Sequence, residues 1–134
     1  MCVLSLPVRL WDRVVAHCLD GLPLEACGLL AGRGEQVYEV YPAANAARSA
    51  RLYTVEPKDL LRADRAAETA GLSLIGVWHS HTHTAAYPSP TDIGQAPDPD
   101  WHYVLVSLSD AEPVVRSYRI LAGRAEEERV FTPA

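Results

Sequence analysis

A short apolar run ends directly in two histidines, and this junction constrains the fold more than any other part of the chain. Residues 72–78 are mostly apolar and have the length of a buried strand. Because side chains alternate along a strand, His79 and His81 point the same way if the strand continues that far. The carboxyl end of a strand is where ligands usually bind in open α/β sheets. The run therefore predicts an α/β fold with a site at this position.

A carboxylate and a hydroxyl follow, since seven residues separate His81 from the segment Ser89-Pro90-Thr91-Asp92. Two histidines and one carboxylate, with a fourth position left to water, form a common ligand set of hydrolytic zinc sites. The segment also predicts a helix start, with Ser89 as N-cap and Pro90 in the first helical position. Alone, it would be only a cap, and the histidine pair only surface decoration. The two interpretations are compatible, because a cap fixes where Asp92 points.

Length and composition indicate one compact domain over residues 1–134. The chain is 49% hydrophobic and 22% charged, which suits a soluble protein with a real core. A net charge of −5 argues against nucleic acid as a partner, and no apolar stretch approaches a membrane span. The first eleven residues lack signal-peptide features. An odd number of cysteines without paired spacing indicates reduced thiols and a cytoplasmic protein: Cys2, Cys18 and Cys27.

Hydrophobic periodicity and turn residues predict alternating strands and helices. Strand patterns occur at residues 1–7, 25–32, 36–41, 72–81, 101–108, 113–121 and, as an edge strand, 126–131. Helical patterns occur around residues 11–18, at 57–70, and in a short stretch that starts at Ser89 and stops before Pro97. We expect the acidic run at residues 126–128 to be solvated surface.

A catalytic zinc needs a group beside it that moves the protons of its water. Glu25 is the best candidate, because it stands at the start of an otherwise apolar strand. A solvated strand end would explain the same residue. The long separation between Glu25 and His79 in the sequence does not decide between these interpretations.

The chain resembles the JAMM, or MPN+, metalloprotease family. That family's pattern is an upstream Glu, then His-x-His, seven residues, Ser, two residues and Asp, which Glu25, His79, His81, Ser89 and Asp92 match in full. The resemblance implies a cytidine-deaminase-like α/β fold with a mixed sheet flanked by helices. It also implies one Zn²⁺ per chain on the two histidines and the aspartate. Glu25 would then move protons, and the Ser89 hydroxyl would stabilise the oxyanion.

Within that family the chain is most similar to short bacterial hydrolases that act on sulfur-carrier adducts. The likeness rests on the segments 25–28, 30–32, 45–49, 79–82, 86–89, 102–107 and 116–120. It implies a partner that is a ubiquitin-like sulfur carrier protein ending in Gly-Gly, and an amide cleavage that releases cysteine. Asn45, Arg48 and Tyr53 are candidates to line a slot for the Gly-Gly tail. Ordinary loop residues are an equally good explanation of these three.

Two other functions stay open. An isopeptidase that removes a ubiquitin-like protein from lysine would use the same residues, although the chain has no room for the large insertions with which eukaryotic relatives grip ubiquitin. A non-catalytic scaffold of this fold typically lacks a ligand position, whereas this chain keeps them all. Two further residues invite other chemistry. His83 continues the alternation of the histidines, and we expect it not to be a ligand. Cys27 shares a strand face with Glu25, and we expect it to be structural.

Overall fold

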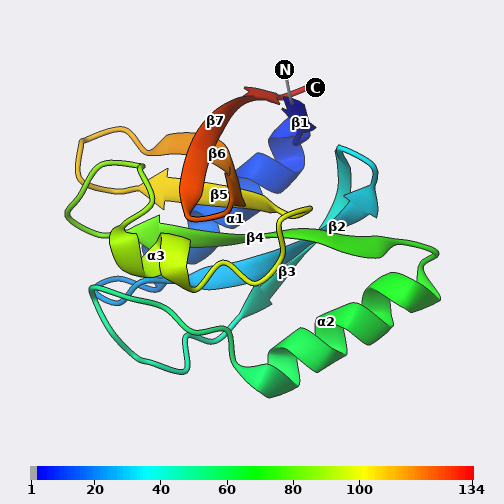
Figure 1. Cartoon of the computed structure of the whole chain (residues 1–134), viewed down its shortest axis with the longest axis horizontal. Coiled ribbons are helices and arrows are strands. Elements are labelled where there is room, and N and C mark those ends of the chain that lie inside the picture. Colours follow the sequence, from blue (N-terminus) through cyan, green and yellow to red (C-terminus); the bar gives the residue numbers. More distant parts are fainter. Residues whose placement is uncertain (1–2) are drawn as a thin grey trace.

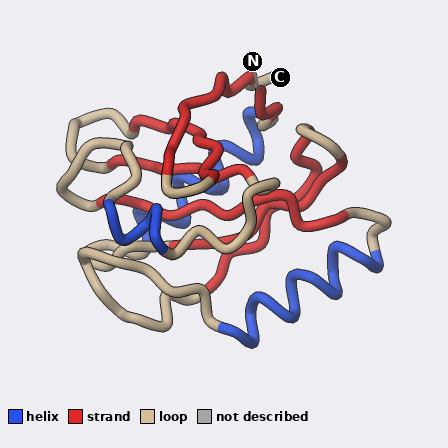
Figure 2. Tube along the Cα trace, viewed as in Figure 1, coloured by secondary structure: helices blue, strands red, loops and turns tan. Residues whose placement is uncertain are grey.

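A single twisted sheet with helices packed against it organises the chain (Figure 1). The computed structural model describes residues 3–134. Figure 2 shows that strands form the centre and that long loops gather at one end of the sheet. In chain order the elements are β1 (Val3–Ser5), α1 (Val8–Asp20), β2 (Cys27–Arg33), β3 (Gln36–Ala43), α2 (Pro57–Thr69), β4 (Ser73–His81), α3 (Pro90–Gly94), β5 (His102–Ser107), β6 (Val114–Leu121) and β7 (Arg124–Phe131).

The sheet is mixed, as expected, and it closes into a barrel in the order β1-β3-β2-β4-β5-β6-β7. β4 runs parallel to β5 and antiparallel to β2. The prediction of an edge strand at residues 126–131 is wrong, because β7 lies between β6 and β1. β1 pairs in parallel with β7 from Val3–Arg129 to Ser5–Phe131. This pairing provides hydrogen-bond partners for backbone N–H and C=O groups that would be unpaired on an edge strand.

Alternation along β4 sends neighbouring side chains to opposite layers of the protein. Trp78 packs with Val14 and Cys18 of α1, in the layer behind the sheet. Val77 packs in the other layer with Ala63 of α2. The amphipathic face predicted for the first helix is therefore confirmed. His79 shares the face of Val77, so the histidines emerge on the α2 side. In the described part of the chain, no helix combines the length and apolar character needed to cross a bilayer.

The acidic run at residues 126–128 departs from expectation at one residue. Glu126 and Glu127 are exposed as expected, but Glu128 is only 4% exposed. Its Oε2 accepts a hydrogen bond from Ser117 Oγ and lies equally close, 2.6 Å, to Nδ1 of His102. Because these partners replace water, the carboxylate can lie inside the barrel. The prediction that the whole run is solvated surface is wrong for Glu128.

Candidate metal centre

Strand β4 positions both histidines at the centre of the sheet. The strand extends through His81, so the predicted alternation holds and the two rings share one face. His79 is flanked by Cys27 of β2 and Leu105 of β5. His79 and His81 are 4% and 5% exposed. Strands on both sides thus hold the two imidazoles in a buried position.

Helix α3 delivers the carboxylate through its cap. Ser89 is the N-cap, and its Oγ accepts a hydrogen bond from Asp92 N at 3.0 Å. In return, Asp92 Oδ2 accepts one from Ser89 N at 2.9 Å. This reciprocal capping box fixes the direction of the Asp92 side chain, which is buried. The predicted cap and the predicted ligand are therefore the same structure.

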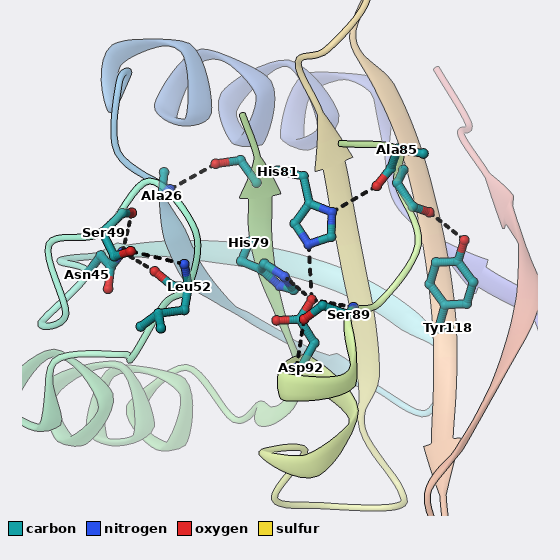
Figure 3. Close-up of polar contacts among 12 residues, drawn as sticks. Ala26, Asn45, Ser49, Leu52, His79, His81, Ala85, Ser89, Asp92 and Tyr118 are labelled. Atoms are coloured by element: carbon teal, nitrogen blue, oxygen red, sulfur yellow. Dashed lines mark hydrogen bonds and ion pairs between the residues drawn. The ribbon is translucent and has the colours of Figure 1, made fainter. Parts of the chain in front are cut away.

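The three side chains converge on one point (Figure 3). Asp92 Oδ2 lies 3.1 Å from His79 Nε2 and 3.0 Å from His81 Nε2. The three candidate ligand atoms all lie within 4.8 Å of one another. Among residues 3–134, no other group of three or more His, Cys, Asp or Glu side chains comes together in this way.

The hydrogen bonds of His81 show that a cation fits between these atoms. His81 Nδ1 lies 2.8 Å from Ala85 O, which can only accept, so the ring proton belongs on Nδ1. Nε2 then offers a lone pair toward Asp92 Oδ2, and two acceptors 3.0 Å apart need a positive charge between them. A histidine that donates its second nitrogen to a carbonyl is the usual arrangement around a bound metal. Two imidazole nitrogens and a carboxylate oxygen also suit zinc chemically.

The pKa shifts of His79, His81 and Asp92 also favour a cation at this position. Burial lowers the pKa of His79, which keeps this imidazole neutral. Burial opposes ionisation of Asp92, but hydrogen bonds with His79 and His81 outweigh it and hold the Asp92 pKa well below its usual range. For His81, burial lowers the pKa, and hydrogen bonds to Asp92 and Ala85 more than compensate and raise it. A metal ion at this position would therefore compete with a proton for His81 Nε2 and Asp92 Oδ2.

Glu25 is 4% exposed and lies two positions before β2, which begins at Cys27 and not at Glu25 as the sequence had predicted. Its Oε1 is buried and has no hydrogen-bond partner within the described residues. Burial raises the pKa of Glu25 to about 7, while the charge of His81 lowers it and that of Asp92 raises it. The charges of His81 and Asp92 thus act on the ionisation of Glu25. A buried carboxyl without a partner, near its pKa at neutral pH, is suited to exchange a proton.

The three candidate residues for a Gly-Gly slot occupy different environments. Tyr53 reaches the site, because its ring stacks on His79 with centroids 4.1 Å apart. Asn45 ties its loop to the segment before β2, because its Nδ2 donates to the backbone oxygens of both Leu52 and Glu25. Arg48 is exposed and has a positive φ of 47°. The loop interpretation thus fits Asn45, whereas Tyr53 contacts a candidate ligand.

The two residues that suggested other chemistry do not belong to the converging group, although Cys27 lies opposite His79 on the neighbouring strand. His83 is exposed and does not belong to the converging group. Burial raises the pKa of Cys27 to about 12, and its Sγ lies 3.5 Å from Ala44 O. A thiol that stays protonated is a poor nucleophile. Cys18 and Cys27 are free thiols, and Cys2 lies outside the described residues.

Sequence reasoning missed the carbonyl of Ala85, which orients His81. A backbone oxygen carries no residue-type signal, so no motif could have revealed it. The stack of Tyr53 on His79 was also not foreseen, because it depends on how the loop before α2 folds onto β4.

Comparison with known proteins places this geometry in a family. Residues 7–121 match the family described as prokaryotic homologues of the JAB domain. The chain belongs to this family. The resemblance to JAMM/MPN proteins, and with it the expected fold class, is confirmed.

Two named relatives and one solved structure align over much of the chain. The CysO-cysteine peptidase of Mycobacterium tuberculosis is 44% identical over 131 residues, which cover 96% of this chain and 90% of that protein. A probable TtuB-protein conjugate cleaving protease of Thermus thermophilus is 43% identical over 95 residues, 70% of this chain and 64% of that protein. The solution structure of a Desulfitobacterium hafniense protein superposes with a TM-score of 0.89 at 33% identity, covering 98% of this chain and 92% of that one.

Proposed function

We propose that the protein is a zinc-dependent peptidase of the JAMM type. In this proposal it hydrolyses an amide bond at the C-terminal Gly-Gly of a ubiquitin-like sulfur carrier protein and releases cysteine. The observation that carries the proposal is the convergence of His79 Nε2, His81 Nε2 and Asp92 Oδ2 in a buried site whose charges act on an unpartnered carboxyl, Glu25.

His79, His81 and Asp92 would hold one zinc ion per chain. Bound there, zinc would supply a Lewis acid that polarises a carbonyl and lowers the pKa of a water molecule. The protein's own contribution is rigidity. The Ala85 carbonyl orients His81, and the capping box orients Asp92. Neighbouring strands keep the site buried, which strengthens electrostatic interactions within it.

Glu25 is assigned the proton transfers. Burial raises its pKa to about 7, which lies close to neutral pH, where a general base and acid is most effective. The carboxylate would take a proton from the attacking water and return it to the leaving amine. Oε1 is free for this purpose, since it has no hydrogen-bond partner among residues 3–134.

Ser89 is assigned the stabilisation of the oxyanion. Its Oγ accepts the hydrogen bond from Asp92 N, so its own hydroxyl proton remains available to donate. Ser89 and His81 line the same surface pocket, which supports this assignment. A donor fixed in place before the reaction is the arrangement that stabilises a developing negative charge.

The substrate class is supported by the relatives. The Mycobacterium tuberculosis protein is named for a conjugate of CysO with cysteine, and it aligns with 96% of this chain. A flexible Gly-Gly tail suits a narrow site, because it can approach backbone and metal without side-chain clashes. Free buried thiols at Cys18 and Cys27 suit a reducing compartment, so we assign the activity to the cytoplasm.

Cleavage of a lysine isopeptide is the second candidate. The Thermus thermophilus relative is named for TtuB-protein conjugates. In addition, a pocket of about 440 Å³ beside His81 and Ser89 is lined largely by apolar groups that include Tyr87 and Ile93. The aliphatic stem of a lysine would fit such a surface. A scaffold without activity is disfavoured, because all ligand positions of the family pattern are present.

A direct assay separates these functions. Zinc-loaded protein is incubated with CysO carrying a C-terminal cysteine and, separately, with CysO joined to the lysine side chain of a peptide, and the products are weighed by mass spectrometry. We expect faster release from the cysteine conjugate. Faster cleavage of the lysine conjugate would establish the isopeptidase instead. Cleavage of neither by protein that holds zinc would make it a scaffold.

A further inference from the structure

Tyr53 contacts a metal-ligand candidate without offering a ligand atom. Its ring stacks on the imidazole of His79, with centroids 4.1 Å apart and planes inclined by 19°. The partner histidine, His81, is oriented differently, by the hydrogen bond of its Nδ1 to Ala85 O. For Nδ1 of His79 the described residues supply no such bond. Stacking on Tyr53 therefore holds the face of this ring, while Asp92 contacts its Nε2 and His81 packs against it edge-on.

The loop around Tyr53 is built to hold that ring in place. The Asn45 amide bonds to the backbone on both sides of it: Nδ2 donates to Leu52 O and Oδ1 accepts from Thr54 N, each at 3.0 Å. Asn45 also pairs with Val55 as an isolated β-bridge. Figure 3 shows Asn45 with Ser49 and Leu52, whose backbone oxygens accept hydrogen bonds from its Nδ2. Tyr53 thus sits in a backbone segment that is fixed before and after it.

The same tyrosine forms part of an apolar pocket next to the metal centre. This pocket has a volume of about 390 Å³, and Tyr53, Val77 and Trp101 contribute to its lining, together with Leu60 of α2. Val77 precedes His79 by two positions on the same face of β4. Tyr53 consequently contacts both the apolar pocket and the imidazole of His79.

We infer that Tyr53 is a positioning residue that orients His79 for metal binding and links the apolar pocket to the metal centre. The inference rests on the proposed zinc site but not on any particular substrate. Substitution of a residue that hydrogen-bonds to a metal ligand typically lowers metal affinity by about 10–100-fold. A stacking contact is weaker, so we expect an effect of about two- to tenfold.

The test compares three variants in the absence of substrate. Tyr53→Phe keeps the stacked ring, Tyr53→Leu keeps apolar bulk without a flat ring, and Leu60→Ala opens the pocket wall contributed by α2. Zinc affinity is measured by competition with a chelator, and ligand geometry by the visible absorption of the Co²⁺-substituted protein. We expect the parent's affinity and spectrum for Tyr53→Phe and Leu60→Ala. Tyr53→Leu should bind zinc two- to tenfold more weakly and show shifted Co²⁺ bands.

Parent-like affinity and spectrum in Tyr53→Leu would overturn the inference. If that variant does not fold, Tyr53→Met, with a flexible apolar side chain, replaces it under the same criteria. Turnover of a CysO–cysteine conjugate adds a second criterion: Tyr53→Leu should lower kcat at similar KM, and Leu60→Ala should raise KM at similar kcat. If the parent does not cleave the conjugate, the proposed function fails, while the metal measurements still decide the role of Tyr53.

Discussion

Two buried sites in this protein combine histidine with a carboxylate, and their hydrogen bonding differs. In the first, His81 gives its Nδ1 proton to Ala85 O, and its bare Nε2 faces Asp92 Oδ2. His79 Nε2 faces the same oxygen. His81 Nε2 and Asp92 Oδ2 therefore face each other as acceptors, and within residues 3–134 only a shared proton balances this pair.

In the second site, both contacts fall on one carboxylate oxygen, Glu128 Oε2, while the other oxygen, Oε1, is buried without a hydrogen-bond partner among the described residues. Glu128 Oε2 receives the hydroxyl of Ser117 and pairs with Nδ1 of His102, both at 2.6 Å. The three residues come from β7, β6 and β5, so they tie the strands that complete the barrel. No cation is needed to balance these contacts.

The difference shows that residue types alone do not distinguish a binding site from an interior ion pair. What distinguishes them is where the second histidine nitrogen and the carboxylate lone pairs point. Converging acceptors require a cation, whereas a matched donor and acceptor form a structural contact. The comparison predicts that substitutions at the first site change chemistry and metal content, and that substitutions at the second change stability.

The largest effect is expected for Glu25→Gln. The amide has nearly the size of the carboxyl but cannot accept the proton of water, so turnover should fall by a factor on the order of 10²–10⁴. Zinc should remain bound, because Glu25 is assigned to proton transfer and not to the ligand set. Zinc content and single-turnover rate are measured on one preparation. Near-parental turnover would show that another residue is the base, and loss of zinc would make Glu25 a ligand.

Removal of a ligand should act on the metal itself. Asp92→Ala deletes the oxygen on which both histidines converge. Zinc affinity should therefore fall by more than about 100-fold, which exceeds the effect of substituting a residue that only supports a ligand. His83→Ala is the matched control, since His83 is exposed and lies outside the converging group. Chelator competition measures both. If the His83 variant loses zinc and the Asp92 variant retains it, His83 and not Asp92 is the ligand.

The second histidine–carboxylate site should respond in stability and not in metal content. Glu128→Ala leaves His102 and Ser117 buried without their partner, and breaking a buried pair of this kind costs about 3 kcal/mol. Denaturant unfolding of zinc-loaded protein measures the change, with the exposed Glu126→Ala as control. Zinc per folded chain should stay at the parental value. A variant that keeps its stability but loses zinc would erase the distinction between the two sites.

A smaller effect should appear in the pH dependence of metal-free protein. Burial raises the Glu25 pKa from 4.5 to about 7, so the folded state holds this proton more tightly than the unfolded state. Ionisation therefore destabilises the folded protein increasingly between those values, by on the order of 2 kcal/mol above pH 7. Glu25→Gln has no such proton and should be more stable than the parent at pH 8 but similar at pH 4. An equal stability difference at both pH values would show that Glu25 is not buried as an acid.

Local sequence signals predicted the parts of the site that lie on single elements. The apolar run before His79 predicted β4, and the segment from Ser89 to Asp92 predicted the N-cap of α3. Both depend on contacts within a few residues, where periodicity and cap chemistry are informative. The family pattern added Glu25, whose long separation from the histidines had left its place undecided.

Contacts between distant segments could not be predicted in the same way. Glu128 was assigned to the surface because it follows two exposed glutamates, yet its partner His102 lies 26 positions away. The barrel closure likewise depends on a short strand, Val3–Ser5, which pairs with β7 at the other end of the chain. The stack of Tyr53 on His79 needs the folded loop held by Asn45. In each case the decisive partner is set by tertiary packing, which outweighs local pattern.

The most direct test of the account is the metal content of the active protein. Protein prepared without a metal-binding tag is analysed for zinc and assayed on the CysO–cysteine conjugate before chelation, after chelation and after zinc is restored. We predict about one zinc per chain, loss of hydrolysis with loss of the metal, and recovery when zinc returns. Metal-free protein that still hydrolyses the conjugate would contradict the account.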